Sequence, residues 1–150
     1  GAMTPRGIHA LDSLISMAGP VITVFAFSEN REIPVEVDDV TSALLRFGTG
    51  VTGSITAHHA TADYWRVHAA GSKGWMEMRG PSDLTVCTLE GEPDRVPLAA
   101  TDMERAELEA FADFVAGGPY PVSNAQALNA VAVIEAMVAS ARSGQAVRLH

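Results

Sequence analysis

Apolar residues in the first part of the chain recur at the spacing of a helix. They stand at Ile8, Leu11, Leu14, Ile15 and Ala18, which fall on one side of a helix with 3.6 residues per turn. Thr4 suits the N-cap and Pro5 the first helical position, while Gly19-Pro20 ends the pattern. The sequence therefore predicts a helix between Thr4 and Gly19.

From Val21 to Thr88 the pattern changes to short β-forming runs that are separated by turn residues. The predicted strands are 21–28, 37–47, 51–60, 64–70, 75–78 and 84–88. Their short connections favour antiparallel pairing, most clearly around Thr49-Gly50. If that turn is a two-residue loop, Leu44 lies opposite Ile55, and both faces of the hairpin carry apolar residues.

These two partly apolar faces have two interpretations. A sheet that is covered by helices on one side only should be polar on its free side, so apolar residues there favour a second partner surface, such as another subunit. Scattered exposed apolar residues are also ordinary in strands of this kind. The sequence leaves both interpretations open.

Two helices with capping signals close the chain. Thr101 and Glu104 form the first capping box, and Ser123 and Gln126 form the second. A glycine follows the last apolar residue of each helix. The order helix, strands, helix, helix predicts an α+β fold, with helices on one face of an open, mainly antiparallel sheet. We expect residues 1–150 to form a single domain.

Composition narrows the classes of function. The 150 residues are 47% hydrophobic, which is enough for one core without metals or disulfides. The formal charge of −8, from 18 acidic and 10 basic residues, disfavours binding to nucleic acid or anionic membranes. No apolar run reaches the roughly 20 residues that span a bilayer. The single cysteine, Cys87, cannot form an internal disulfide, so we expect a cytoplasmic protein.

The glycines of residues 48–53 spell a dinucleotide-binding fingerprint, but they lack its context. Such a motif binds pyrophosphate when it leaves a strand and opens a helix. Here the β-forming run Ser54-Ile55-Thr56-Ala57 follows, so a hairpin is predicted and no cofactor site is expected in this chain. His58 and His59 are consecutive strand residues that point to opposite faces, and they do not predict a metal site.

His9 is the residue that most suggests chemistry. Asp12 follows three residues later on the neighbouring side of the predicted helix, close enough to orient the imidazole. A histidine held by a carboxylate is an acid/base device, but it is also a common way to satisfy a buried histidine. Spacing alone leaves these two interpretations open.

Four segments occur along the chain in a distinctive order: Gly7-Ile8-His9-Ala10-Leu11-Asp12, the strand residues 44–50 with Gly53, the turn Ala70-Gly71-Ser72-Lys73-Gly74, and the last helix from Val133 to Gly144. Together they resemble the C-terminal domain of the Gfo/Idh/MocA oxidoreductases, over nearly the whole chain. The resemblance implies an open-faced sheet of the dihydrodipicolinate-reductase-like type. It also implies an N-terminal Rossmann domain, absent from this chain, that binds NAD or NADP.

The resemblance implies a function for the complete protein and a role for one residue. The complete protein would be an NAD(P)-dependent oxidoreductase that acts on a sugar, a polyol or a related hydroxy compound. This chain would bind the substrate and pair subunits into a homo-oligomer, without being active alone. His9 matches the family's histidine, which helps to move the proton of the substrate hydroxyl, and Asp12 is a candidate for its support.

Two departures from the family pattern leave other functions open. Many members have an aspartate four residues before that histidine, where this chain has Pro5. The family's catalytic lysine belongs to the missing domain, and the only lysine here, Lys73, lies in a turn. A non-catalytic dimerisation or ligand-binding module of the same fold is therefore an alternative. A third is a cone-shaped α+β enzyme that uses His9 and Asp12 without a nucleotide.

Overall fold

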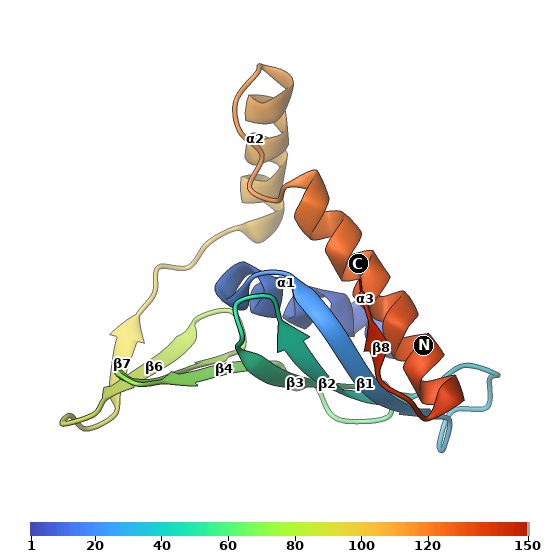
Figure 1. Ribbon diagram of the computed structural model, residues 1–150. Helices are drawn as coiled ribbons and strands as arrows, with labels where there is room; N and C mark the ends of the chain where they lie inside the picture. The colour runs from blue at the N-terminus through green and yellow to red at the C-terminus, as the bar shows by residue number, and fades with distance from the viewer. Residues whose placement is uncertain (150) are drawn as a thin grey trace. The chain divides into compact units, whose positions relative to one another are not determined.

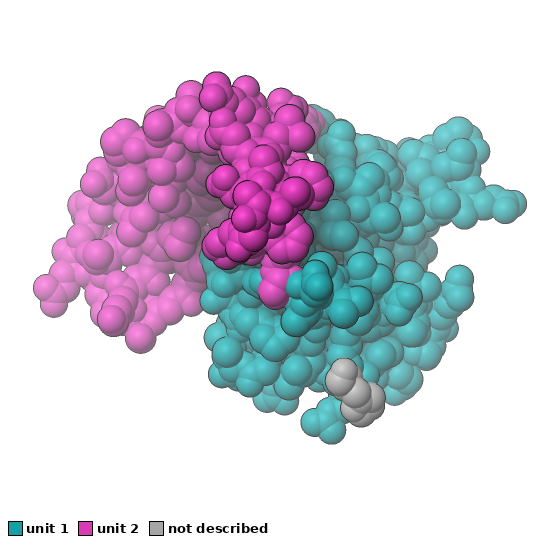
Figure 2. Space-filling view, turned by 90° about the horizontal axis from the view of Figure 1, so that it is seen from above, with its two compact units in different colours: residues 1–62, 124–150 teal, residues 63–123 magenta. Residues whose placement is uncertain are grey.

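The computed structural model describes residues 1–149, which form two compact units (Figure 2). Unit 1 combines two separate parts of the chain, residues 1–62 and 124–150, and unit 2 consists of residues 63–123 between them. Each unit has its own four-stranded antiparallel sheet. The α+β class and the antiparallel pairing expected from the sequence are confirmed, with the strands divided between two sheets.

The sheet of unit 1 has the strand order β3-β2-β1-β8. β1 (Val21–Glu29) pairs with β2 (Val40–Phe47) over nearly its whole length, and β2 pairs with β3 (Thr52–His58). β8 (Val147–Arg148) returns from the far end of the sequence to the other side of β1. β8 is too short to show a period of two, so the sequence pattern does not predict it.

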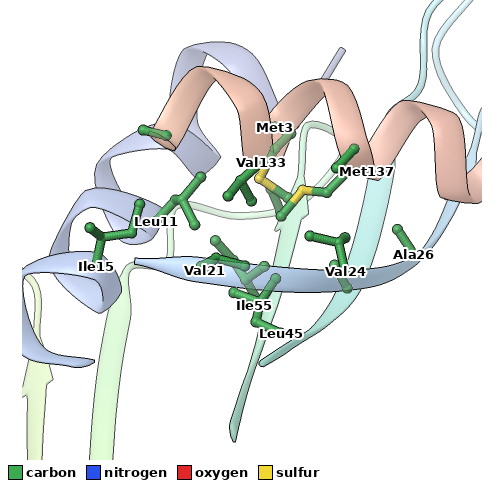
Figure 3. Close-up of a cluster of buried hydrophobic side chains, with 14 of the residues drawn as sticks. Met3, Leu11, Ile15, Val21, Val24, Ala26, Leu45, Ile55, Val133 and Met137 are labelled. Atoms are coloured by element: carbon green, nitrogen blue, oxygen red, sulfur yellow. The ribbon is translucent and has the colours of Figure 1, made fainter. Parts of the chain in front are cut away.

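Helices α1 (Ile8–Ala18) and α3 (Asn124–Ser143) cover one face of this sheet, and the core lies between them and the strands. Side chains from both helices point toward β1 in Figure 3. The buried helix residues are Leu11, Ile15, Ala130, Val133, Ala136 and Met137. The buried strand residues are Val21, Val24, Ala26, Ala43, Leu45, Phe47, Ile55 and Ala57. In β2 and β3 these are alternate residues, so one face is packed and the other is left open.

The first residues of the chain also belong to this core. Ala2 and Met3 are buried, and a π-helical turn, Met3–Gly7, runs directly into α1. The predicted N-cap at Thr4 is wrong, because the helical segment begins earlier. The backbone N–H of Ala2 donates to Asp38, through both its carbonyl (3.1 Å) and its carboxylate (2.9 Å), and this anchors the earlier start.

The β2–β3 hairpin differs from its predicted register by one residue. The N–H of Gly50 donates to the carbonyl of Phe47 (3.0 Å), and the loop has three residues rather than two. Gly50 has a φ of 88°, the left-handed conformation that closes three-residue hairpin loops. Leu44 consequently lies opposite Ser54, not Ile55. The shift puts Ile55 on the buried face, where it joins the core.

Unit 2 contains a meander with the strand order β4-β5-β6-β7. Its strands are β4 (Arg66–Gly71), β5 (Gly74–Arg79), β6 (Asp83–Thr88) and β7 (Asp94–Pro97). Figure 1 labels β4, β6 and β7. The sequence pattern does not predict β7, because its four residues include two charges and a proline. One row across the four strands is Val67, Met78, Leu84 and Val96. The next row is His68, Glu77, Thr85 and Arg95, so one face is apolar and the other polar.

The ends of the last two helices follow the predicted chemistry, with one shift. α2 (Met103–Val115) is capped by Asp102, whose Oδ1 accepts from the N–H of Arg105 (3.0 Å), so the predicted cap at Thr101 is wrong by one residue. A carboxylate is the stronger acceptor for the free amides at a helix start. α3 begins directly after Ser123, and Gly144, with a φ of 66°, follows its end as predicted. None of the described helices is long and apolar enough to cross a membrane.

Candidate functional site

His9 lies in the first turn of α1 and points away from the core. Leu11 and Ile15 bury one side of this helix, and two residues before Leu11 the helix has turned by about 200°. The side chain of His9 is exposed, whereas Asp12, on the flank of the helix, is half-buried. The interpretation of His9 as a buried histidine is therefore wrong. Its imidazole is accessible to a ligand.

The structure does not join His9 to Asp12. The carbonyl of His9 accepts a hydrogen bond from Ser13 Oγ at 3.0 Å, but among residues 1–149 no hydrogen bond or ion pair links its imidazole to Asp12. Residues three apart lie on neighbouring sides of a helix, and contact also requires suitable rotamers. Asp12 therefore lies on the neighbouring side of the helix but does not fix the orientation of the His9 imidazole.

Pro5 lies one turn before His9, on the same side of the helical segment. It is exposed within the π-helical turn. A proline side chain offers no carboxylate, and its nitrogen carries no hydrogen to donate. Pro5 therefore offers His9 neither an acidic partner nor a hydrogen-bond donor.

The other motifs singled out in the sequence lie in and next to the β2–β3 hairpin. The glycines of residues 48–53 lie in the β2–β3 hairpin, as predicted. His58 is exposed at the end of β3, and the backbone N–H of His59 donates to the carbonyl of Asp39 at 2.8 Å. Within the described chain, no three His, Cys, Asp or Glu side chains gather as they would around a metal ion.

The open face of the unit 1 sheet carries large apolar side chains. Phe27 and Leu44 are each 63% exposed, and the rings of Phe25 and Phe27 meet edge to face with centroids 5.1 Å apart. Phe25 pairs with Leu44 across β1 and β2. A shallow depression on this part of the sheet is lined by Thr23, Phe25, Leu44, Leu45, Arg46, Thr52, Gly53 and Ser54. The face is thus apolar in the middle and rich in hydroxyl groups around it.

The polar face of unit 2 holds a second shallow depression, which sequence reasoning missed. It is lined by Arg66, His68, Ala70, Trp75 and Glu77. Glu77 binds two arginines, Arg66 Nε at 2.9 Å and Arg79 Nε at 2.6 Å. A hydrogen bond to Tyr64 and then the charge of Glu77 raise the pKa of Arg66 above its ordinary value. Alternate residues of two runs joined by Ser72-Lys73-Gly74 are the signal that could have found this cluster.

Asp39 organises the loop between β1 and β2. This residue is buried, and its Oδ2 accepts the backbone N–H groups of Arg31 (3.0 Å), Glu32 (2.5 Å) and Ile33 (3.1 Å). These hydrogen bonds, that of Glu32 first, hold the pKa of Asp39 below its ordinary value of 3.8. The predicted strand start at Val37 is wrong for this reason: the loop folds around Asp39, and β2 begins only at Val40.

Comparison with solved structures shows the same fold in known oxidoreductases. An aldose-aldose oxidoreductase from Caulobacter crescentus matches 99% of this chain with a TM-score of 0.86 and 24% identity, over 48% of its own length. An oxidoreductase from Desulfitobacterium hafniense, described as NADPH-dependent, matches 99% of this chain with a TM-score of 0.88 and 24% identity, over 48% of its own length. Levoglucosan dehydrogenase in complex with NADH and L-sorbose matches 100% of this chain with a TM-score of 0.82 and 23% identity, over 50% of its own length. At these identities the likeness establishes the fold.

The chain spans about half the length of each of these structures. Comparison with curated protein sequences finds no match. The sequence pattern that describes the GFO/IDH/MocA C-terminal domain matches residues 1–77, which include His9, both strands of the β2–β3 hairpin and the turn at Lys73. The expected resemblance is confirmed: this chain belongs to the GFO/IDH/MocA C-terminal domain family.

Proposed function

We propose that the chain is the substrate-binding half of an NAD(P)-dependent oxidoreductase that acts on a sugar, a polyol or a related hydroxy compound. One observation carries the proposal: the whole chain matches half of each oxidoreductase, at TM-scores of 0.82 to 0.88 for the three described above. Two of those structures hold hydroxy compounds, glycerol in one and L-sorbose in the other. The same class of compound is our proposed substrate.

The described residues do not fit a dinucleotide. Their only glycine fingerprint lies in a hairpin, and no parallel strand–helix–strand unit is present to aim amides at a pyrophosphate. NAD or NADP, which exchanges hydride with the substrate, is therefore assigned to a Rossmann domain outside this chain. The chain by itself is expected to be inactive.

His9 is the proposed acid/base residue of this chain. Its exposed imidazole takes the proton of a substrate hydroxyl as the carbon that bears it is oxidised, and it returns a proton in the reverse direction. Asp12 is assigned a weaker part, which is to stabilise the protonated imidazole from the next side of the helix. The absence of a hydrogen bond between them leaves the imidazole free to turn toward a substrate.

Subunit pairing is proposed for the open face of the unit 1 sheet. Phe25, Phe27 and Leu44 form an apolar centre there, and exposed apolar groups of this size are common at protein interfaces. A specific dimer buries about 1,200 Å² or more in total, which a face of four strands can supply in large part. We expect a homo-oligomer in the cytoplasm, the location that the single cysteine Cys87 favours. The charge of −8 disfavours nucleic-acid and anionic-membrane partners.

One observation favours a second function, a non-catalytic dimerisation or ligand-binding module. Pro5 stands one turn before His9 and removes the acidic partner that this side of the helix could have supplied. Without such a carboxylate, this position supplies no side-chain acceptor that could orient the imidazole toward a substrate. A module of this kind would still pair subunits or bind a ligand through the open face of the unit 1 sheet, but it would not catalyse a reaction.

The test uses the complete protein, expressed from the reading frame that contains this chain. We expect it to reduce NAD or NADP when polyols and sugars are supplied, followed by absorbance at 340 nm. The 150-residue chain, titrated with either nucleotide in a calorimeter, should give no heat of binding. Micromolar affinity in that titration would contradict the division into two halves. Nucleotide binding without turnover on any hydroxy compound would favour the module.

A further inference from the structure

The side of α2 that carries its largest apolar residues is uncovered. Leu108, Phe111, Phe114 and Val115 are 69%, 56%, 51% and 71% exposed. Their spacing of three, three and one places them on one side of the last two turns, and we call them the α2 face. The ring of Phe114 contacts Tyr120 just beyond the helix, with centroids 5.5 Å apart. No residue of α2 is buried.

A helix of this length needs a partner for its apolar side. α2 has 13 residues, and isolated helices shorter than about 12–15 residues are marginal in water. Its own sequence offers an N-cap at Asp102 and one exposed ion pair, Arg105–Glu109, which stabilise it only slightly. Tertiary packing of the α2 face is the contribution that is missing.

The comparisons show how much longer the matched oxidoreductases are than this chain. The matched oxidoreductases reproduce 99–100% of this chain, α2 included, and each is about twice as long. These oxidoreductases thus share the fold of this chain, and each contains a second part of about the same length. That second part is the partner that we consider for the exposed side of α2. On the proposed function, that half is the nucleotide-binding domain.

The charged residues of α2 indicate which charges a complementary partner surface would carry. Glu104 and Glu107 lie on the same side as the α2 face, one to two turns nearer the start of the helix. Arg105, Glu109 and Asp113 lie on the other side. A matching partner is therefore apolar opposite Phe111 and carries Lys or Arg opposite Glu104 and Glu107.

We propose that the α2 face is the docking surface for the nucleotide-binding half of the same oxidoreductase. The inference rests on the proposed function, since it requires that half to exist. It assigns α2 to holding the two halves together, a part distinct from both His9 and the open sheet face. The binding contribution comes from burying Phe111 and its neighbours, and orientation comes from the two glutamates.

Hydrogen–deuterium exchange on the complete protein tests this directly. We expect the amides of residues 103–115 to exchange at least about tenfold more slowly in the complete protein than in the 150-residue chain. Phe111→Ser should abolish that protection, and Glu107→Lys should weaken it without disturbing the helix, because lysine is a good helix former. Leu89→Ser is the control, since Leu89 is 74% exposed in the same unit but lies outside the α2 face.

Several results would overturn the inference. Equal protection of α2 in both chains would mean that this chain covers its own helix. Loss of oligomers in Phe111→Ser, seen by light scattering, would mean that a second copy covers it. If the complete protein binds NAD or NADP and α2 still exchanges rapidly, the docking inference alone fails. If it binds neither nucleotide, the proposed function fails first.

Discussion

The hydroxyl of Ser140 stands between the backbones of Ala26 and Gln145. The N–H of Ala26 donates to Ser140 Oγ (2.9 Å), and the same hydroxyl donates to the carbonyl of Gln145 (2.6 Å). The register of β1 with β8, in which Val24 lies opposite Val147, would place Gln145 opposite Ala26. A fully buried side chain of α3 thus continues the ladder where β8 stops.

Ser140→Ala should therefore destabilise unit 1. The substitution leaves the buried Ala26 N–H without its partner, which costs about 1–3 kcal/mol. Urea denaturation followed by circular dichroism measures the difference. Ser143→Ala, an exposed hydroxyl on the same helix, is the matched control and should change stability by no more than about 0.5 kcal/mol. Equal effects of the two would contradict the assigned role of Ser140.

Asp39→Asn should make stability less dependent on acid pH. Because the pKa of Asp39 is lowered in the folded chain, its ionised form stabilises the fold above its ordinary pKa of 3.8, and that contribution is lost as the pH falls below it. We expect the variant to melt about 2–4 °C lower at pH 7. The two melting temperatures should converge toward pH 3. A constant difference across this range would exclude the carboxylate as its cause.

His9→Gln tests the proposed acid/base role in the complete protein. Because the side chain is exposed, the melting temperature should not change. Turnover should fall about 10²- to 10⁴-fold, the contribution of one general acid or base, with unchanged nucleotide affinity. His58→Gln, another exposed histidine of unit 1, is the control and should retain activity. Full activity of His9→Gln would favour the non-catalytic module.

Leu44→Arg tests the open face of the unit 1 sheet. A charge at the centre of the apolar patch cannot be buried without a partner, so we expect the oligomer to dissociate in light scattering. Leu128→Arg makes the same change at a 71% exposed position on α3 and should leave assembly intact. A wild-type chain that stays monomeric at high concentration would argue against the pairing surface altogether.

Much of the fold follows from local signals in the sequence. Gly19 ends α1 with a φ of 86°, and Gly144, with a φ of 66°, follows the end of α3, because glycine takes that conformation at no steric cost. Errors arise where two local solutions compete. The hairpin loop that contains Gly50 could have two residues or three, and the structure has three. Asp102 competes with Thr101 to accept from the free backbone amides at the start of α2.

The candidate site was less accessible to sequence reasoning. Helical spacing placed His9 beside Asp12, but it does not decide which rotamer each side chain takes, and no hydrogen bond joins them. The Arg66 and Glu77 pair was missed because its members face each other only through the register of two strands. Burial of Asp39 depends on three amides of the preceding loop, and no periodicity reports that loop's shape.

The divided sequence of unit 1 determines when it can fold. Its sheet begins with β1, but Ser140 and the buried side chains of α3 are synthesised only after the 61 residues of unit 2, 63–123. A nascent chain that ends before Asn124 exposes the face of β1 that α3 later covers. Closing that long loop delays the core, so unit 2 is expected to gain structure first on the ribosome.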